Sequence, residues 1–435
     1  MNKNNLWGEE TQKAIENYPI SGLRSNISFV YTIVFIKKAA AKVNNHLKLL
    51  DKNKSDTIIN SCNDILRGKY DDQFIIDPYQ AGAGTSIHMN VNEVIANLTN
   101  THPNDDVNMS QSTNDVIPTA IRITTLLKLP SLIKAIEQLE DSFSIKAEQF
   151  EKIIKSGRTH LRDALPITLG QEFSAYAKAV EKDKRRIERS AENLHEIGIG
   201  GTGVGTGITS HQNYHHLMVK ELSKLTNLPL KSSGNLFETM QNAADFLDFS
   251  GSLRILAQTI IRISNDLRLL SSGPMTGFNE IELPEVQKGS SIMPGKVNPS
   301  ILEMATMVSI QVIGYDQAIL LSSQAGQLEL NVMLPLIAHN LFEQMKLLTN
   351  AITVLNDKCI KGIKTNERMC KYWFERSVGI GAILNRTLGY DKAAQVVKYA
   401  LENNSSIKQA VIEKKLLSEK EIEKLFSVEK LTNPF

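Results

Sequence analysis

The sequence predicts an all-α protein, and three observations support this fold class. Apolar residues recur at helical spacing over long stretches, and no alternating strand-like pattern of any length occurs. The hydrophobic share is 42% and the aromatic share only 6%, so leucine, isoleucine, valine and alanine must provide most of the packing, which suits helices. The segment 300–350 is helix-like throughout and is broken only near Gly326 and Pro335.

The predicted helices follow one another with short interruptions. Helical spacing extends from residue 22 to residue 66 and stops at Gly68. It returns over 116–150, where Pro130 should kink or divide the helix. A polar loop, GRTHLRDALP, leads to a helix over 168–195 that ends in a glycine-rich segment. A buried helix over about 243–270 ends at SSGP, and shorter helices follow from about residue 370.

The longest predicted helices exceed what one compact domain can cover. At 1.5 Å per residue, a straight helix over 300–350 would extend roughly 75 Å. Helices this long and this apolar need partners over their whole length, and a second copy of the same chain is the natural source of such partners. The sequence therefore predicts a homo-oligomer.

Charge and cysteine content narrow the class of partner and the compartment. The 49 basic and 47 acidic side chains leave a formal charge of +2, which favours a small-molecule partner over nucleic acid or an anionic membrane. Charges interrupt the most hydrophobic stretches before the roughly 20 apolar residues of a bilayer span, and the start MNKNNLWGEE has no signal-peptide core. Cys62, Cys359 and Cys370 have unrelated spacings and predict reduced thiols. We therefore expect a cytoplasmic protein.

Several motifs allow both a structural and a functional interpretation. GIGGTG at 198–203 matches a dinucleotide-binding fingerprint, but it follows a predicted helix rather than a strand, so a glycine-rich connection between helices is the better interpretation. The nine histidines form no HExxH motif, and His215 and His216 are adjacent, which argues against a metal site. His160 lies in a polar loop between two helices, where a functional role is as plausible as a structural one.

Two short stretches are typical of helix starts. SQSTND at 110–115 contains good N-cap residues. Because a helix N-terminus also binds carboxylates, capping and ligand binding are compatible there. GAGTS at 82–86 similarly combines a tight backbone with hydroxyl groups, and it is a weak signal alone.

The stretch GSSIMPGKVNP at 289–299 has the composition of a mobile lid. Gly289 and Gly295 allow unusual dihedrals at either end, and Pro294 and Pro299 prevent helix formation. A flexible surface loop would explain these residues if the loop stood alone. The loop also carries a positive charge, an amide and two hydroxyls that could bind an anion or take a proton: Lys296, Asn298, Ser290 and Ser291.

At this loop the sequence resembles the aspartase/fumarase superfamily. The family signature G-S-S-x-M-P-x-K-x-N-x-x-x-x-E is matched in full from Gly289 to Glu303. GAGTS, NMSQSTNDVIPTA, GRTHLRDALPITLGQEF and GQLELNVMLP extend the resemblance over essentially the whole chain. GAGTS, STND and GQLELNVM are closer to aspartate ammonia-lyases than to class II fumarases. The resemblance implies elimination of ammonia from L-aspartate to give fumarate, with a fumarase or a related amino-acid lyase as alternatives.

The resemblance also implies an architecture. Members of the family are all-α homotetramers with a central bundle of twenty helices, in which three subunits form each active site. Three domains are expected on this chain: an N-terminal helical domain over 1–113, a central long-helix domain over 114–368, and a small C-terminal helical domain over 369–435. Such an assembly would let residues far apart in the chain converge on a dicarboxylate substrate.

The same resemblance assigns roles in the reaction. Ser290 would act as an alkoxide base that removes the Cβ proton, and hydrogen-bond donors would stabilise the resulting aci-carboxylate. No cofactor and no metal are implied, because the substrate's own carboxylate is the electron sink. The β-carboxylate would be bound by Thr85, Ser112, Thr113 and Ser291, and the α-carboxylate by Lys296, Asn298 and Thr159. The amino group would face Asn114 and the second catalytic residue, His160.

The sequence departs from the family's pattern at several positions. The usual lead-in R-x-E-x-D-x-x-G is missing before LWG, and the connection over 95–107 is shorter than in typical members. His88 stands where asparagine is common, and Arg162 stands where glutamine is common and adds a cation near Thr159. These departures keep the substrate assignment open. A helical scaffold without catalysis is a further alternative, although Ser290, Lys296, Asn298 and His160 are all present.

Overall fold

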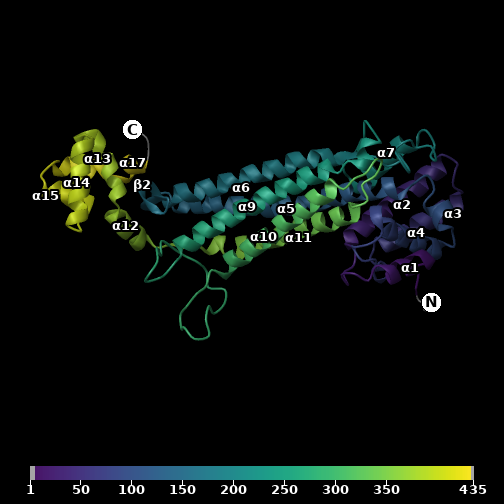
Figure 1. Cartoon of the computed structure of the whole chain (residues 1–435), viewed down its shortest axis with the longest axis horizontal. Coiled ribbons are helices and arrows are strands. Elements are labelled where there is room, and N and C mark those ends of the chain that lie inside the picture. Colours follow the sequence, from purple (N-terminus) through teal and green to yellow (C-terminus); the bar gives the residue numbers. More distant parts are fainter. Residues whose placement is uncertain (1–4, 433–435) are drawn as a thin grey trace. The chain divides into compact units, whose positions relative to one another are not determined.

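The computed structural model describes residues 5–432 and confirms the predicted all-α class (Figure 1). Residues 1–4, which form part of the stretch tested for a signal peptide, lie outside the described residues. The chain divides into two compact units, each built from three separate stretches. Unit 1 comprises Met1–Lys134, Asp183–Ala257 and Ser309–Thr349, and unit 2 comprises Ala135–Lys182, Gln258–Val308 and Asn350–Phe435. The division into three consecutive domains stays a prediction.

Unit 1 is built around α2, which packs against α3, α4 and α7. The helical run predicted over 22–66 is two helices, because the chain turns after His46 and Asp51 caps the next helix by accepting from two backbone N–H groups. The helices confined to unit 1 are α1 Glu9–Asn17, α2 Ile27–His46, α3 Lys52–Ile65, α4 Thr85–Thr99, α7 Tyr214–Thr226 and α8 Glu238–Gln241. The short turns are η1 Asp71–Gln73, η2 Gly82–Gly84, η3 Pro103–Val107 and η4 Asn193–His195.

The glycine-rich segment after α6 is a connection between helices, as the sequence predicted. It follows a strand of only two residues, β3 Glu196–Ile197, which pairs in parallel with β4 Lys231–Ser232. The segment then leads to α7. A dinucleotide-binding fingerprint needs a long strand before it and a helix directly after it, and neither is present here.

Long helices contribute residues to both units, and Figure 1 shows them as the longest ribbons. The helices predicted over 168–195 and 243–270 are confirmed, and the segment 300–350 breaks between Ser323 and Leu334, near the predicted Gly326 and Pro335. The bounds are α5 Thr113–Gln149, α6 Leu169–Glu192, α9 Ala244–Leu270, α10 Ser300–Ser323 and α11 Leu334–Lys358.

Pro130 was predicted to kink or divide the helix, and it does not divide it, because α5 continues through both Pro118 and Pro130. Each proline removes one backbone hydrogen bond and crowds the preceding turn. Pro130 and Ser131 are exposed, but the helix buries apolar side chains just before and after them, with Leu126 at 3% and Leu132 at 0% exposure. Burial of this apolar surface outweighs the cost of one missing hydrogen bond.

Unit 2 contains a β-hairpin where the sequence predicted a loop. Strands β1 Ile154–Thr159 and β2 Arg162–Thr168 are antiparallel, and Thr159 pairs with Arg162. The two residues between them, His160 and Leu161, have φ of 55° and 54°, as in a tight turn with a positive φ at both central positions. The hairpin was missed because THLR lacks the Asn-Gly or Asp-Gly pair that usually signals such a turn.

The predicted short helices near the C-terminus are confirmed and belong to unit 2. They pack around a core that includes Leu384, Val396 and Val411. Ser406 and Ser418 begin two of these helices with reciprocal capping boxes. The remaining elements of unit 2 are β5 Ile281–Glu282, β6 Lys364–Thr365, η5 Ile360–Gly362, α12 Glu367–Arg376, η6 Val378–Ile380, α13 Gly381–Leu388, α14 Tyr390–Glu402, α15 Ile407–Glu413, α16 Glu419–Leu425 and α17 Val428–Thr432.

The three cysteines are free and buried, which agrees with the predicted reduced thiols. Burial raises the pKa of the thiol to about 12 for Cys62 and Cys359 and to about 11 for Cys370. The thiolate is the reactive form, so these cysteines are poor nucleophiles at neutral pH.

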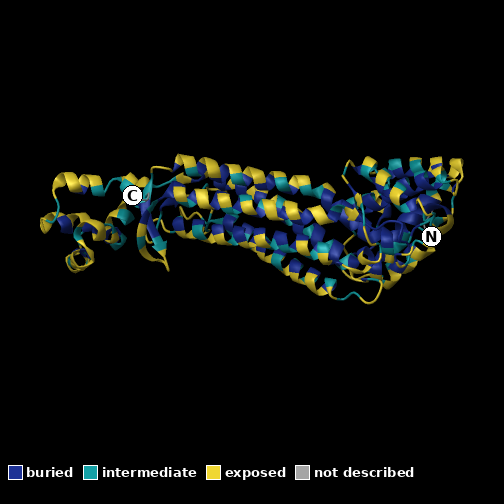
Figure 2. Ribbon diagram, turned by 90° about the horizontal axis from the view of Figure 1, so that it is seen from above, coloured by how far each residue is buried: buried dark blue, intermediate teal, exposed yellow. Residues whose placement is uncertain are grey.

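Figure 2 shows exposed and buried residues alternating along the long helices. On α10 the exposed residues include large apolar ones: Met307, Ile310 and Leu321 are 67%, 59% and 60% exposed. By length and composition alone, α5 and α10 could cross a membrane, contrary to the expectation that charges interrupt every such stretch. In the most apolar window of α5, 67% of residues are buried, as in a core helix, against 28% for α10.

Candidate active site

The signature loop joins β5 to α10 in unit 2 and is closed at its base by two hydrogen bonds. The N–H of Gly289 donates to the carbonyl of Lys296 at 3.0 Å, and the side-chain amide of Asn298 donates to the carbonyl of Gly289 at 2.6 Å. A Cβ atom at Gly289 would lie 2.3 Å from the Lys296 carbonyl oxygen. The predicted unusual dihedral is present at Gly295, where φ is 78°, but Gly289 is required for close approach instead.

The hydroxyl of Ser290 lies in front of two backbone donors. Its Oγ accepts from the N–H of Ile292 at 3.2 Å and from the N–H of Met293 at 3.1 Å. Hydrogen bonds to the charged form of a group favour that form, so both donors would stabilise an alkoxide at Oγ. The local backbone therefore provides part of the environment that a serine base needs.

The other candidate residues of the loop are exposed or hold the loop closed. Ser291 and Lys296 are exposed. Asn298 uses part of its hydrogen-bonding capacity within the loop, so it has a structural contact besides its predicted ligand contact. The side chain of Ile292 is 83% exposed, an apolar group that closure of the loop over a ligand would cover.

Thr159 and His160 lie at the exposed tip of the β1–β2 hairpin. Arg162 is also exposed and pairs with Thr159 across the hairpin, so the cation noted in the sequence is next to a predicted α-carboxylate ligand. A hairpin holds these side chains in a defined register, which a loop would not do. The tip is thus a more rigid platform than the sequence suggested.

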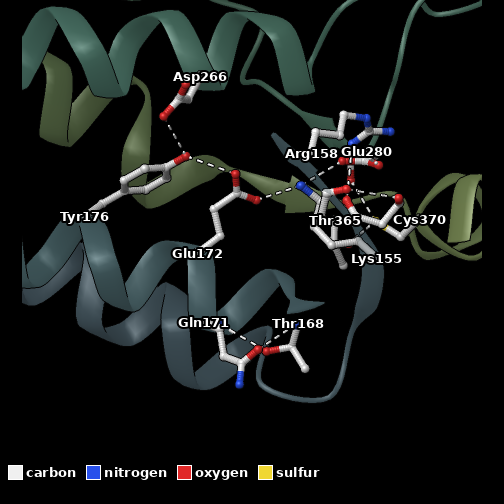
Figure 3. A network of polar contacts seen from close by, with 12 residues as sticks. Lys155, Arg158, Thr168, Gln171, Glu172, Tyr176, Asp266, Glu280, Thr365 and Cys370 are labelled. Carbon is white, nitrogen blue, oxygen red and sulfur yellow. Dashed lines mark hydrogen bonds and ion pairs between the residues drawn. The ribbon is translucent and has the colours of Figure 1, made fainter. Parts of the chain in front are cut away.

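A buried ionic network ties the hairpin to the segment that enters the signature loop (Figure 3). Glu280 is fully buried, with Oε1 2.9 Å from Arg158 Nη1 and Oε2 3.0 Å from Lys155 Nζ. Lys155 also contacts Glu172 of α6 at 2.7 Å, and the Arg158 guanidinium stacks 4.1 Å from the ring centroid of Phe278. Carboxylates thus neutralise both the buried Lys155 and the partly buried Arg158.

The backbone of Glu280 binds the network to the start of α12 as well. Its carbonyl accepts from the N–H of Asn366 at 2.9 Å and from the thiol of Cys370 at 3.5 Å. On the other side of the network, the Tyr176 hydroxyl contacts Glu172 at 3.2 Å and Asp266 at 3.3 Å (Figure 3). No spacing rule links residues this far apart in the chain, so the sequence did not predict this network.

In unit 1, the predicted helix start at SQSTND is confirmed. The Oγ of Ser112 accepts from the N–H of Asn114 at 3.3 Å, and α5 begins at Thr113. The amide of Asn114 donates to the carbonyl of Gly203 at 2.8 Å, which binds the helix start to the glycine-rich segment. Ser112, Thr113 and Asn114 are half-buried, so a ligand could still reach them.

Asp115, which the sequence indicated only as a good N-cap residue, binds the start of α5 to the glycine-rich segment. Its Oδ1 accepts from the N–H of Ser112 at 2.9 Å, and its Oδ2 accepts from the N–H of Gly200 at 2.9 Å and of Thr202 at 3.0 Å. Burial raises the pKa of Asp115 to about 6, while the three N–H donors oppose that rise. The available signal was a carboxylate at the third position after a serine N-cap, the pattern of a capping box.

Thr85 is the first residue of α4 and is exposed. The turn before it is tight, because Ala83 and Gly84 have φ of 60° and 88°. The hydroxyl of Thr85 donates weakly to the carbonyl of Gly82, at 3.3 Å. GAGTS is therefore a helix start with an exposed hydroxyl, as its composition indicated.

The predicted site residues fall into two groups. Thr85, Ser112, Thr113 and Asn114 belong to unit 1, and Thr159, His160, Ser290, Ser291, Lys296 and Asn298 belong to unit 2. Their convergence on one substrate stays a prediction. Among residues 5–432, no group of three or more His, Cys, Asp or Glu side chains is placed to hold a metal ion.

An all-helical fold with a serine held in a glycine-closed loop defines this protein as a lyase of the fumarase type. The family model described as lyase matches residues 1–314, and the model described as fumarase C C-terminus matches residues 382–433. The chain belongs to this lyase family.

Curated relatives match the chain over nearly its full length. The aspartate ammonia-lyase of Bacillus subtilis (strain 168) is 42% identical over 440 aligned positions, which cover 98% of this chain and 93% of that protein. The aspartate ammonia-lyase of Escherichia coli (strain K12) is 43% identical with the same coverage. The class II fumarate hydratase of Corynebacterium efficiens is also 43% identical, over 98% of this chain and 93% of its own.

Solved structures have the same fold. A fumarate lyase:delta crystallin from Brucella melitensis, bound to cobalt, superposes with a TM-score of 0.97 and is 41% identical, covering 100% of this chain and 97% of its own. The class II fumarase of Schistosoma mansoni gives a TM-score of 0.95 at 30% identity, covering 99% of this chain and 96% of its own. These matches confirm the predicted family and fold class.

Proposed function

We propose that the chain catalyses the reversible elimination of ammonia from L-aspartate to give fumarate. The observation that carries the proposal is the Ser290 hydroxyl, which accepts from the N–H groups of Ile292 and Met293 within a complete signature loop. The aspartate ammonia-lyases among the relatives support the choice of substrate.

The reaction begins with removal of a proton from Cβ, a carbon beside a carboxylate and a very weak acid. Ser290 acts as the base in its alkoxide form, which the two N–H donors stabilise. The negative charge that develops spreads onto the β-carboxylate as an aci-carboxylate. Hydroxyl groups then stabilise that charge, and the free N–H groups at the start of α5 add a favourable dipole. The hydroxyl groups are those of Thr85, Ser112, Thr113 and Ser291.

The rest of the substrate is held by its α-carboxylate and its amino group. Lys296, Asn298 and Thr159 bind the α-carboxylate, with the Lys296 ammonium as the charged partner. His160 and Asn114 face the amino group, which leaves as ammonia once the Cα–N bond breaks. The electron pair of the Cβ–H bond forms the double bond of fumarate.

The proposed working form is a cytoplasmic homotetramer with composite active sites. The exposed apolar residues Met307, Ile310 and Leu321 of α10 support it, because burial of such residues between copies removes them from water. Replacement of Met307 and Leu321 with glutamate should lower the mass measured by light scattering. A tetramer that persists in this double variant would argue against a subunit interface at α10.

The reaction is tested by incubating the purified protein with L-aspartate, L-malate and methylated aspartates and following fumarate or methylfumarate absorbance. L-Aspartate should react fastest. Ser290→Ala should lower kcat by about a thousandfold or more while the circular dichroism spectrum stays unchanged. Lys288→Ala is the matched control, because Lys288 is an exposed lysine of the same loop. Unchanged turnover by Ser290→Ala would exclude Ser290 as the base.

A fumarate hydratase is the second candidate. The relative from Corynebacterium efficiens favours it, since its identity of 43% equals that of the Escherichia coli aspartate ammonia-lyase. Faster formation of fumarate from L-malate than from L-aspartate would establish this alternative. The same Ser290→Ala variant would then report on the base of the hydration reaction.

A further inference from the structure

Lys37 is a fully buried lysine in the middle of α2 whose ammonium group is surrounded by acceptors. Its Nζ lies 2.6 Å from His88 Nε2, 2.8 Å from Asn108 Oδ1 and 3.0 Å from Gln111 Oε1. An ammonium group has three hydrogens, and each of these contacts can use one of them. In this state Nε2 of His88 accepts, so the ring proton must lie on Nδ1.

The other ring nitrogen of His88 reaches a predicted substrate ligand. Nδ1 lies 2.7 Å from Oγ1 of Thr113, the first residue of α5. If Nδ1 carries the ring proton, it donates to Oγ1, and the hydrogen of the Thr113 hydroxyl is left to point elsewhere. Thr113 is half-buried, whereas His88 and Lys37 are buried, so the hydroxyl is the end of this chain of contacts nearest to solvent.

We propose that the Lys37–His88 pair sets the direction of the Thr113 hydroxyl and makes it a hydrogen-bond donor to a carboxylate of the substrate. His88 is thus a positioning residue that acts through Thr113. This inference rests on the proposed function, in which Thr113 binds the β-carboxylate. It also explains how histidine can replace the asparagine that is common in the family at position 88. Asparagine has one donor and one acceptor group, so it can bridge Lys37 and Thr113 in the same way.

Loss of a proton from Lys37 would exchange the donor and acceptor roles in the hydrogen bonds from Lys37 through His88 to Thr113. A neutral amine can donate to Asn108 and Gln111 and accept from Nε2–H of His88. The Nδ1 atom then accepts from Thr113, and the hydroxyl no longer has a hydrogen for a carboxylate. Burial lowers the pKa of Lys37 to about 7, so both states fall in an accessible pH range.

Other charged groups near this chain of contacts are few. The titratable groups that face Lys37 are Cys62 of α3, His88 of α4 and Asp115 of α5. On the remaining elements packed against α2, Asp106 of η3 is paired with Lys54, and Glu221 of α7 is paired with Lys42. Burial and the nearby Lys37 both keep the pKa of His88 well below its ordinary value, so His88 stays neutral.

The test is a double-mutant cycle on the binding of succinate, a dicarboxylate without a leaving group, measured by calorimetry at pH 6.5. His88→Leu and Thr113→Val should each raise the Kd about tenfold, the effect of losing one hydrogen bond to a charged group. The double variant should bind no more weakly than Thr113→Val, because His88 acts only through Thr113. A further tenfold loss in the double variant would overturn the inference.

A conservative variant and a control guard against general damage to the fold. His88→Asn should restore the Kd to within about threefold of the wild-type value, whereas a loss equal to that of His88→Leu would overturn the inference. His216→Asn is the control, because His216 is an exposed histidine of α7, and its Kd should not change.

The pH profile is a second readout. The wild-type Kd should rise as the pH passes through about 7, the pKa of Lys37, and His88→Leu should lack this rise. Identical profiles would overturn the inference. Succinate binding without turnover of L-aspartate would refute the proposed function and leave this inference standing, whereas a wild-type protein that does not bind succinate would overturn it.

Discussion

Replacement of Glu280 with glutamine removes one negative charge, that of Glu280, from the network that joins the hairpin to the signature loop. Glutamine has nearly the volume of glutamate, so packing is preserved and only the charge changes. Lys155 keeps Glu172 at 2.7 Å, but Arg158 is left with the carbonyl of Ser156 at 3.5 Å and the ring of Phe278. The variant therefore holds a partly buried guanidinium group without a carboxylate partner.

The expected cost follows from this arrangement. Removing one partner of a buried ion pair lowers the free energy of unfolding by about 3–5 kcal/mol, and because Lys155 keeps a partner we expect about 3 kcal/mol. For domains of 150–250 residues, each kcal/mol shifts the melting temperature by about 2–4 °C, so Glu280→Gln should melt roughly 6–12 °C lower.

The measurement is a thermal scan followed by circular dichroism at equal protein concentration and scan rate. Glu282→Gln is the matched control, because Glu282 is an exposed glutamate two residues further along, in β5. The control should melt within about 1 °C of the wild type. A Glu280→Gln variant that melts as high as this control would show that the ionic network contributes little, and the reasoning about a buried charge would fail.

Three further changes test other parts of the structure. Asp115→Asn should lower the free energy of unfolding by about 1–3 kcal/mol in denaturant titrations, because one backbone donor now faces an amide N–H; an unchanged midpoint would contradict the three contacts described. Gly157→Ala should destabilise by about 1–3 kcal/mol, since a Cβ there would lie 2.3 Å from the Leu165 carbonyl oxygen, whereas Gly234→Ala has open space and should melt like the wild type. The stabilising contribution of Lys37 is fully present above the pKa of an unfolded lysine, near 10.5, and it is lost as the pH falls to about 7. The free energy of unfolding of Lys37→Met should therefore increase relative to that of the wild type as the pH is lowered from about 10.5 to about 7. A difference that stays constant over this range would contradict the lowered pKa of Lys37.

The sequence predicted the long helices well because their signal is local and repeats many times. The helix over 243–270 is confirmed within a residue or two as α9, and the break between α10 and α11 falls where glycine and proline predicted it. The hairpin was missed because its turn uses His160 and Leu161 with positive φ, a conformation that is uncommon for residues other than glycine. The division predicted at Pro130 is absent for a different reason. Burial of apolar side chains along α5 outweighs the local tendency of proline to interrupt a helix.

The candidate site shows a similar division. Ser290 and its loop were found because the motif is contiguous, but the two N–H donors that face its hydroxyl are a property of the folded backbone. Lys37 and Glu280 act through partners distant in the chain, and no spacing rule links them to those partners. For Asp115, capping-box spacing indicates its contact with Ser112 but not its contacts with Gly200 and Thr202. For Lys37 a signal existed, because it lies four residues after Ile33 and three before Ala40, on the buried side of α2.

The placement of Ser290 in the loop between β5 and α10 has a practical consequence for purified material. Lys288 and Lys296 are exposed on either side of it, in backbone without regular structure, so a trypsin-like protease could cut there and sever the serine from β5 or from α10. On the proposed mechanism, such nicked protein would retain its helical spectrum and its elution volume while its turnover disappears. Preparations of low specific activity should therefore be checked for cleavage by denaturing electrophoresis before the low activity is attributed to the choice of substrate.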